Sequence, residues 1–344
     1  MPQTLAFRQP AMSFPTYHLP GLRIAVSTQT AVVRKALDWM LQLFPQTMAT
    51  PDLLLEASGL DMEDLKAAIS PGTLAALPGD EADPILVESS SGELITLGRF
   101  AGLVYCATLN REQTHARLFC ELNKVEPPQS TIQSIMALML YPVLREVFLQ
   151  NHCLLLHAAA IKCPNGTGIQ LVAESGGGKT TTSLAMVRRG ARLISDDLLV
   201  AGPGAAVRGL PKPLNLRAPT LGFFKELGWL AARSNPRTGK SSLIPQLIYG
   251  PACLASVCTV DIIYFLKLSQ GRPAITRMPA SMALKKLVEA HAFCIRQPTS
   301  GESLSGLCDL LASAAFYQLE TGDNPEYLGQ WLLDNCLGHA RKLN

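Results

Sequence analysis

The sequence has few aromatic residues, no cluster of basic residues and no long uninterrupted hydrophobic run. Aromatic side chains make up 6% of the 344 residues, and 30 basic residues stand against 27 acidic ones, for a net charge of +3. No segment concentrates lysine and arginine as a nucleic-acid-binding surface does, so nucleic acid is not expected as a partner. With 48% hydrophobic and 17% charged residues, the chain is typical of a folded protein large enough for two domains.

The patterns of membrane, secreted and zinc-binding proteins are also missing. The most apolar stretch, 135–149, is broken by Pro142 and by two charged residues, and it is shorter than the roughly 18 residues that span a bilayer. Residues 1–15 lack the basic-then-apolar order of a signal peptide. The nine cysteines form no C-x-x-C pair, which favours buried thiols in a reducing compartment. We therefore expect a cytoplasmic protein without membrane contact, zinc or disulfides.

Hydrophobic periodicity divides the chain into two regions. Residues 1–125 are predicted to form an accessory α+β domain that recognises a partner. Residues 124–129 are predicted to be a proline-containing linker, and residues 130–344 are predicted to form a second domain. The elements expected in the first region are a strand at 22–27, a helix at 31–43 capped by Thr30, a helix at 52–70 and an antiparallel meander at 85–122. In the second region we expect helices at 130–150, 281–292, 304–320 and 327–341, and strands at 153–161, 168–173, 191–195 and 260–268.

The clearest chemical signal is the stretch ESGGGKT, which follows the strand at 168–173 and precedes the helical pattern TTSLAMVRR. A glycine-rich loop in this position lets backbone N–H groups surround a phosphate. The lysine then reaches the β- and γ-phosphates, and the threonine binds magnesium. Ala173 stands where such loops usually have their first glycine, so we expect ordinary backbone dihedrals at that corner. The candidate nucleotide-binding residues are Ser175, Gly176, Gly177, Gly178, Lys179, Thr180 and Thr181.

Two acidic residues, Asp196 and Asp197, follow the strand at 191–195. The carboxyl end of a strand beside a phosphate loop is where open α/β sheets bind ligands. One acid could hold Mg²⁺ while the other accepts a proton from an attacking hydroxyl. The alternative is a pair of aspartates that only cap a turn.

Taken together, His157, ESGGGKT and RRGARLISDD resemble the C-terminal domain of HPr kinase/phosphorylase and related proteins. The resemblance implies an α/β P-loop kinase domain of the type related to phosphoenolpyruvate carboxykinase. It also implies ATP- and Mg²⁺-dependent transfer of a phosphoryl group to a hydroxyl, expected to be that of serine, on a protein or peptide. By position, it implies catalytic roles for His157, Lys179 and, as general base, Asp197. Thr180 and Asp196 are the implied ligands of Mg²⁺.

The chain also departs from the family pattern. No acidic residue occurs between Leu198 and Lys225, so Asp196 or Asn215 must replace the glutamate that binds magnesium in the family. The loop associated with phosphorolysis is not recognisable, and we therefore expect a kinase without phosphorylase activity. The candidates for the catalytic arginine of the family are Arg217, Arg233 and Arg237.

Two further segments have a predicted place near the nucleotide. Residues 209–219 contain three prolines and two cations and are expected to contact substrate or phosphate in the cleft. Residues 233–245 predict either a mobile lid or a plain surface loop, and their Gly239-Lys240-Ser241-Ser242 lacks the glycine spacing of a second phosphate loop.

Three alternatives concern function and assembly. The acceptor hydroxyl could belong to a small molecule, or the chain could sense a nucleotide by binding ATP without phosphoryl transfer. The apolar Leu328, Trp331, Leu332 and Leu337 recur at helical spacing, which indicates core or a contact in a homo-oligomer.

Overall fold

The computed structural model describes residues 16–47, 49–60, 63, 66, 77–80, 84–89, 91–122, 127–210, 212–235, 238–290 and 301–340. The chain forms two compact units, 1–143 and 144–344. The division falls inside helix α4 (Gln129–Gln150), C-terminal to the predicted linker. Residues 124–126 of that linker lie outside the described residues.

Helix α4 is long and mostly apolar. By length and composition alone it could cross a membrane, but 67% of its most apolar 18 residues are buried inside the protein. Burial to this extent is the pattern of a core helix.

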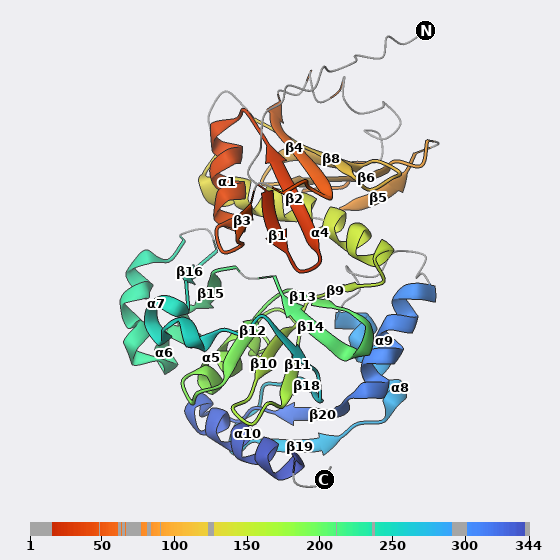
Figure 1. Cartoon of the computed structure of the whole chain (residues 1–344). Helices are drawn as coiled ribbons and strands as arrows, with labels where there is room; N and C mark the ends of the chain where they lie inside the picture. The colour runs from red at the N-terminus through yellow and green to blue at the C-terminus, as the bar shows by residue number, and fades with distance from the viewer. Residues whose placement is uncertain are drawn as a thin grey trace. The chain divides into compact units, whose positions relative to one another are not determined.

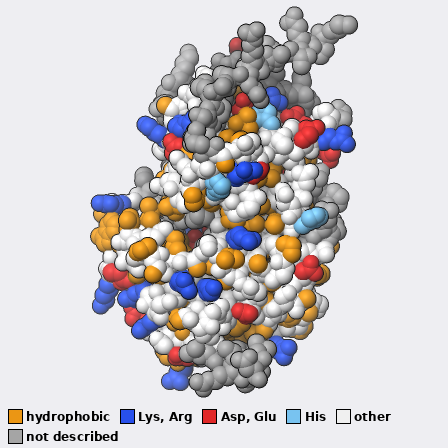
Figure 2. All heavy atoms as spheres, in the orientation of Figure 1, with side chains coloured by type: hydrophobic (Ala, Val, Ile, Leu, Met, Phe, Trp, Pro, Cys, Tyr) orange, Lys and Arg blue, Asp and Glu red, His pale blue; other side chains and the backbone are white. Residues whose placement is uncertain are grey.

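On the face drawn in Figure 2, basic and acidic side chains are interspersed over the surface rather than separated by sign.

The first unit is built on an eight-stranded mixed sheet with the order β3-β1-β2-β4-β8-β7-β6-β5. Strand β4 pairs in parallel with β2 and β8, and the last four strands form the predicted meander. Helix α1 (Ala31–Leu41) follows β2 (Figure 1) and buries Val33 and Leu37. The strands are β1 Thr16–Leu19, β2 Leu22–Ser27, β3 Gln46–Thr47, β4 Leu53–Leu60, β5 Ile85–Glu88, β6 Leu94–Phe100, β7 Leu103–Leu109 and β8 His115–Glu121.

The helix predicted at 52–70 is wrong, because residues 53–60 form strand β4. Leu53, Leu55 and Ala57 are buried in alternation, which is the period of a strand. Hydrogen bonds to strands on both sides outweigh the local helical preference. Most of 61–70 lies outside the described residues. Thr30 precedes α1 as predicted, but its hydroxyl accepts the Gly59 N–H (3.1 Å) instead of capping the helix.

The second unit contains a six-stranded sheet with the order β12-β10-β11-β18-β20-β19. Strands β11, β18 and β20 are parallel, and β10 runs antiparallel to both β11 and β12. Four carboxyl ends, those of β11, β12, β18 and β20, therefore meet at one edge of this sheet. The strands are β10 Ala159–Lys162, β11 Gly168–Val172, β12 Arg192–Ser195, β18 Ile262–Lys267, β19 Ala274–Arg277 and β20 Ala315–Glu320.

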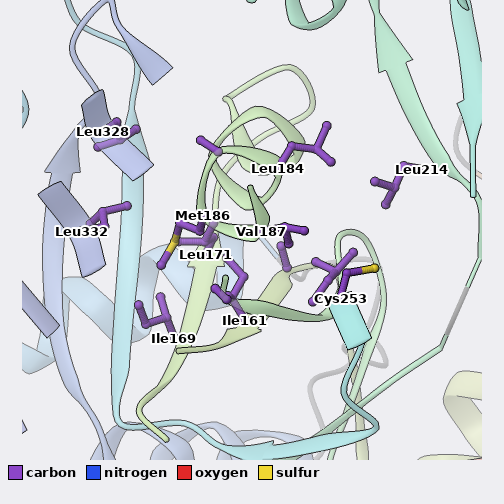
Figure 3. Packing of buried hydrophobic residues seen from close by; sticks show 14 of the residues in the cluster. Ile161, Ile169, Leu171, Leu184, Met186, Val187, Leu214, Cys253, Leu328 and Leu332 are labelled. Carbon is purple, nitrogen blue, oxygen red and sulfur yellow. The ribbon is translucent and has the colours of Figure 1, made fainter. Parts of the chain in front are cut away.

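Alternate residues of this sheet enter two cores. Ile169 and Leu171 of β11 pack with helices α5 (Lys179–Val187) and α10 (Pro325–Ala340), as Figure 3 shows. A Cβ on Gly329 of α10 would lie 2.6 Å from the Ala185 carbonyl oxygen of α5, so only glycine permits this approach. Leu328 and Leu332 are core residues here. On the other face, Val172 packs in a cluster with α8 (Ala280–Ala290) and α9 (Gly301–Ser313).

Two predicted elements of the second unit were wrong in type or extent. The single strand expected at 153–161 is divided between two sheets, because β9 (Leu154–Leu156) pairs with β13 (Leu199–Ala201) and the chain crosses to β10 at His157 and Ala158. The helix expected at 304–320 ends at Ser313. Its last residues instead form β20, which pairs with β18 along its whole length.

Smaller elements complete the second unit (Figure 1). Strands β9, β13, β14 and β17 form an antiparallel sheet, and β15 pairs with β16 in a two-stranded sheet. Their bounds are β13 Leu199–Ala201, β14 Ala206–Gly209, β15 Leu214–Arg217, β16 Lys240–Leu243, β17 Val257–Thr259, α6 Ala218–Phe223 and α7 Gln246–Tyr249, with 3-10 turns η1 Pro203–Ala205, η2 Lys225–Arg233 and η3 Pro251–Cys253.

Candidate active site

The ends of the parallel strands surround a cavity of about 650 Å³ in the second unit. The loop after β11, the two acids after β12, and residues after β18 and β20 all line it. His157 joins them because β10 runs in the opposite direction, which brings its amino end to the same edge. Residues adjoining five strands thus line one cavity, as expected for the carboxyl edge of an open α/β sheet.

The glycine loop turns tightly before α5. Gly176 and Gly178 have φ values of 84° and 94°, which glycine adopts without steric cost. The Gly177 N–H donates to the Glu174 carbonyl oxygen at 3.0 Å, and a Cβ on Gly177 would lie 2.7 Å from the Cβ of Ala173. Ala173 has a negative φ, as predicted. Helix α5 begins directly after this loop, so its first N–H groups add the positive end of the helix.

Lys179 is buried at the floor of the cavity, with 7% of its surface exposed. Its Nζ donates to the Ala173 carbonyl oxygen at 2.5 Å and lies 3.3 Å from Nε2 of His157. Burial lowers the pKa of Lys179, and the negative charges of Asp197 and Asp196 oppose that effect. The ammonium group is therefore held inside the loop, in the concavity where backbone N–H groups would surround a phosphate.

The two acids have opposite environments. Asp196 is buried and accepts a hydrogen bond from the Thr180 hydroxyl at 3.1 Å. Burial, and then repulsion by Asp197, raises the pKa of Asp196 to about 6. Burial also favours the neutral form of Asp197, but the Lys212 ammonium and His157 hold the pKa of Asp197 well below its usual range. Asp197 is thus charged, while Asp196 exchanges a proton near neutral pH.

His157 links the second acid to the lysine. Its Nδ1 lies 3.1 Å from Oδ1 of Asp197, and its Nε2 lies on the Lys179 side. When Nε2 accepts from the ammonium, Nδ1 carries the ring proton and donates to Asp197. The other carboxylate oxygen of Asp197 forms an ion pair with Lys212. Asp197 is therefore held in position by two partners.

The donor set fits Mg²⁺ and a nucleotide. Thr180 and Asp196 offer adjacent oxygen ligands, which magnesium prefers, and metal binding would draw the proton from Asp196. Asn215, the other candidate ligand, also lines the cavity. Within the described part of the chain no group of three His, Cys, Asp or Glu residues could hold a metal. The remaining ligands of a magnesium ion here would be phosphate oxygens and water, as is usual for this ion.

Most of the predicted site residues meet in this cavity. Of the candidate nucleotide-binding residues, all except Gly177 line it; the Thr181 hydroxyl also bonds Thr220 at 2.8 Å. Among the arginine candidates, Arg217 lines the cavity, whereas Arg233 stacks on Trp229 with its guanidinium 5.0 Å from the ring centroid. The third candidate, residue 237, lies outside the described residues.

The sequence did not identify several residues of the site individually. Lys212 lies in the segment 209–219, which was expected in the cleft, but nothing in the pattern indicated its ion pair with Asp197. Asp323 follows β20, which was predicted as helix, so its place at the sheet edge was missed. Lys240 belongs to a segment interpreted as lid or loop, yet it lies in strand β16 and lines the cavity.

Comparison with known proteins found little similarity. No protein-family model and no curated protein matches the chain. A solved structure of the HPr(Ser) kinase/phosphatase from Coxiella burnetii is similar over 55% of this chain and 97% of its own, with 12% sequence identity and a TM-score of 0.29. This relationship is distant and does not assign an activity.

Proposed function

We propose that the protein is an ATP- and Mg²⁺-dependent kinase that transfers the γ-phosphoryl group to a hydroxyl, with serine as the proposed acceptor, on a protein or peptide. The supporting observation is the convergence, in one cavity, of a glycine loop, a buried lysine and two acids with opposite pKa shifts. Pairs of acids whose environments separate their pKa values are typical of catalytic sites.

In this proposal the residues divide the work. The loop N–H groups and Lys179 hold phosphates, Thr180 and Asp196 hold Mg²⁺, and Asp197 accepts the proton of the acceptor hydroxyl. His157 orients Asp197 through Nδ1. Bound Mg²⁺-ATP supplies the phosphoryl group and the cation that neutralises its charge.

The Lys212–Asp197 ion pair sets a condition on the mechanism. While Lys212 contacts Asp197, the pKa of Asp197 is too low for an effective base. Asp197 becomes more basic when Lys212 turns to another anion in the cavity. This ion pair also favours a second candidate function, a module that binds ATP without transferring phosphate.

Labelled ATP distinguishes these functions. The full chain is incubated with Mg²⁺ and [γ-³²P]ATP, first alone and then with protein, peptide and small-molecule hydroxyl acceptors, and products are identified by mass spectrometry. The kinase proposal expects label on a hydroxyl, and no label with Lys179→Ala. ATP binding without transfer or hydrolysis would support the sensor instead.

A further inference from the structure

The two-stranded sheet of β15 and β16 forms one wall of the cavity. Its residues alternate: Leu214, Leu216 and Leu243 are buried in the core beneath α5. The opposite face presents Arg217 and Lys240 to the cavity. This sheet is therefore anchored by its apolar side and offers its polar side to a ligand.

Arg217 and Lys240 are direct partners across the two strands. Like charges in this position repel each other and destabilise a sheet. Among the described residues, no acidic side chain forms an ion pair with either of them. Burial, and then the Arg217 charge, lowers the pKa of Lys240. The fold thus holds two cations side by side, and no acidic side chain among the described residues contacts either of them directly.

The cation pair, Arg217 and Lys240, lies between the glycine loop and the acid pair. Nη2 of Arg217 is 3.5 Å from the Ser175 hydroxyl of the glycine loop. Lys240 is close enough to Asp197 and Asp196 for their charges to act on it. The proposed function assigns the loop N–H groups and Lys179 to the nucleotide, which leaves these two cations for a second anion next to the proposed base.

On the basis of the kinase function proposed above, we propose that Arg217 and Lys240 bind an anionic group of the phosphoryl acceptor, a carboxylate or a phosphate near its reactive hydroxyl. An arginine with a neighbouring lysine suits either group, because the guanidinium can donate two parallel hydrogen bonds to it. The acceptor is then an acidic molecule or a hydroxyl residue flanked by an acidic group.

Calorimetry on the full chain tests this inference. The protein is saturated with Mg²⁺ and the non-hydrolysable ATP analogue AMPPNP, then titrated separately with inorganic phosphate and with malonate. The test variant is Arg217→Gln/Lys240→Gln. The matched control, Arg192→Gln/Arg277→Gln, removes the same charge from the opposite edge of the six-stranded sheet, at the start of β12 and the end of β19.

We expect at least one anion to bind the wild-type complex and to bind the test variant about tenfold more weakly or worse. The control variant should keep the wild-type affinity for the anion. The tighter of the two anions shows whether the acceptor group is a phosphate or a carboxylate. AMPPNP affinity should fall by less than about threefold in the test variant.

Three results would overturn the inference: no anion binds, both variants bind it equally, or AMPPNP affinity falls as much as anion affinity. The last result would assign the cation pair to the nucleotide. Failure of AMPPNP to bind the wild type would instead contradict the kinase function. The same anion titrations on ligand-free wild type and both variants would then decide the anion site separately.

Discussion

The replacement Asp196→Asn should stabilise the protein while weakening its use of magnesium. Asp196 is buried, and its pKa is raised from 3.8 to about 6. A raised pKa contributes stability that is present below about pH 4 and is lost as the pH rises through 6. Asparagine stays neutral and still accepts from the Thr180 hydroxyl. At about 1.4 kcal/mol per pKa unit, the variant should gain on the order of 3 kcal/mol at neutral pH.

Thermal unfolding at several pH values measures this gain. For a unit of about 200 residues, it corresponds to a rise of roughly 6–12 °C in Tm at about pH 8, shrinking to nothing near pH 4. The control is Asp334→Asn, which replaces an exposed carboxylate that accepts a hydrogen bond from Gln330. The Tm of this control should not change. In saturating ATP, the concentration of Mg²⁺ needed for half-maximal stabilisation should be higher for Asp196→Asn. A variant no more stable than wild type at about pH 8 would refute the assigned ionisation.

Four further outcomes are expected. Lys179→Ala should lose nucleotide binding in calorimetry while keeping its circular dichroism spectrum; unchanged ATP affinity would reject the phosphate loop. Asp197→Asn should keep ATP binding and lose about 10²- to 10⁴-fold in transfer rate, and wild-type transfer would require another base. Arg217→Gln/Lys240→Gln should raise the Tm of the ligand-free protein, by removing a repulsion of up to about 1 kcal/mol; a lower Tm would contradict that repulsion. A folded fragment starting near Ser130 should bind ATP but lose transfer to the true acceptor, whereas transfer at the full rate would show that residues 1–125 do not select it.

Local patterns were sufficient for the centre of the site. The strand, glycine loop and helix of residues 168–187 follow one another directly, so their geometry depends on residues close in sequence. Asp196 and Asp197 follow β12 and line the same cavity, at the sheet edge where the pattern predicted them. Where glycine freedom, helix polarity and strand ends act within the single stretch 168–197, the sequence alone was enough.

Pairing between distant segments decided the rest. Residues 53–60 and 315–320 became strands because neighbours far along the chain offered backbone hydrogen bonds. The cations Lys212 and Lys240 reached the cavity through contacts with Asp197 and with β15. No periodicity in one segment encodes such partners, since the energy of a strand pair or an ion pair depends on what the folded chain brings beside it. The sequence by itself determined the glycine loop and the acid pair, and the tertiary structure determined the charges that surround them.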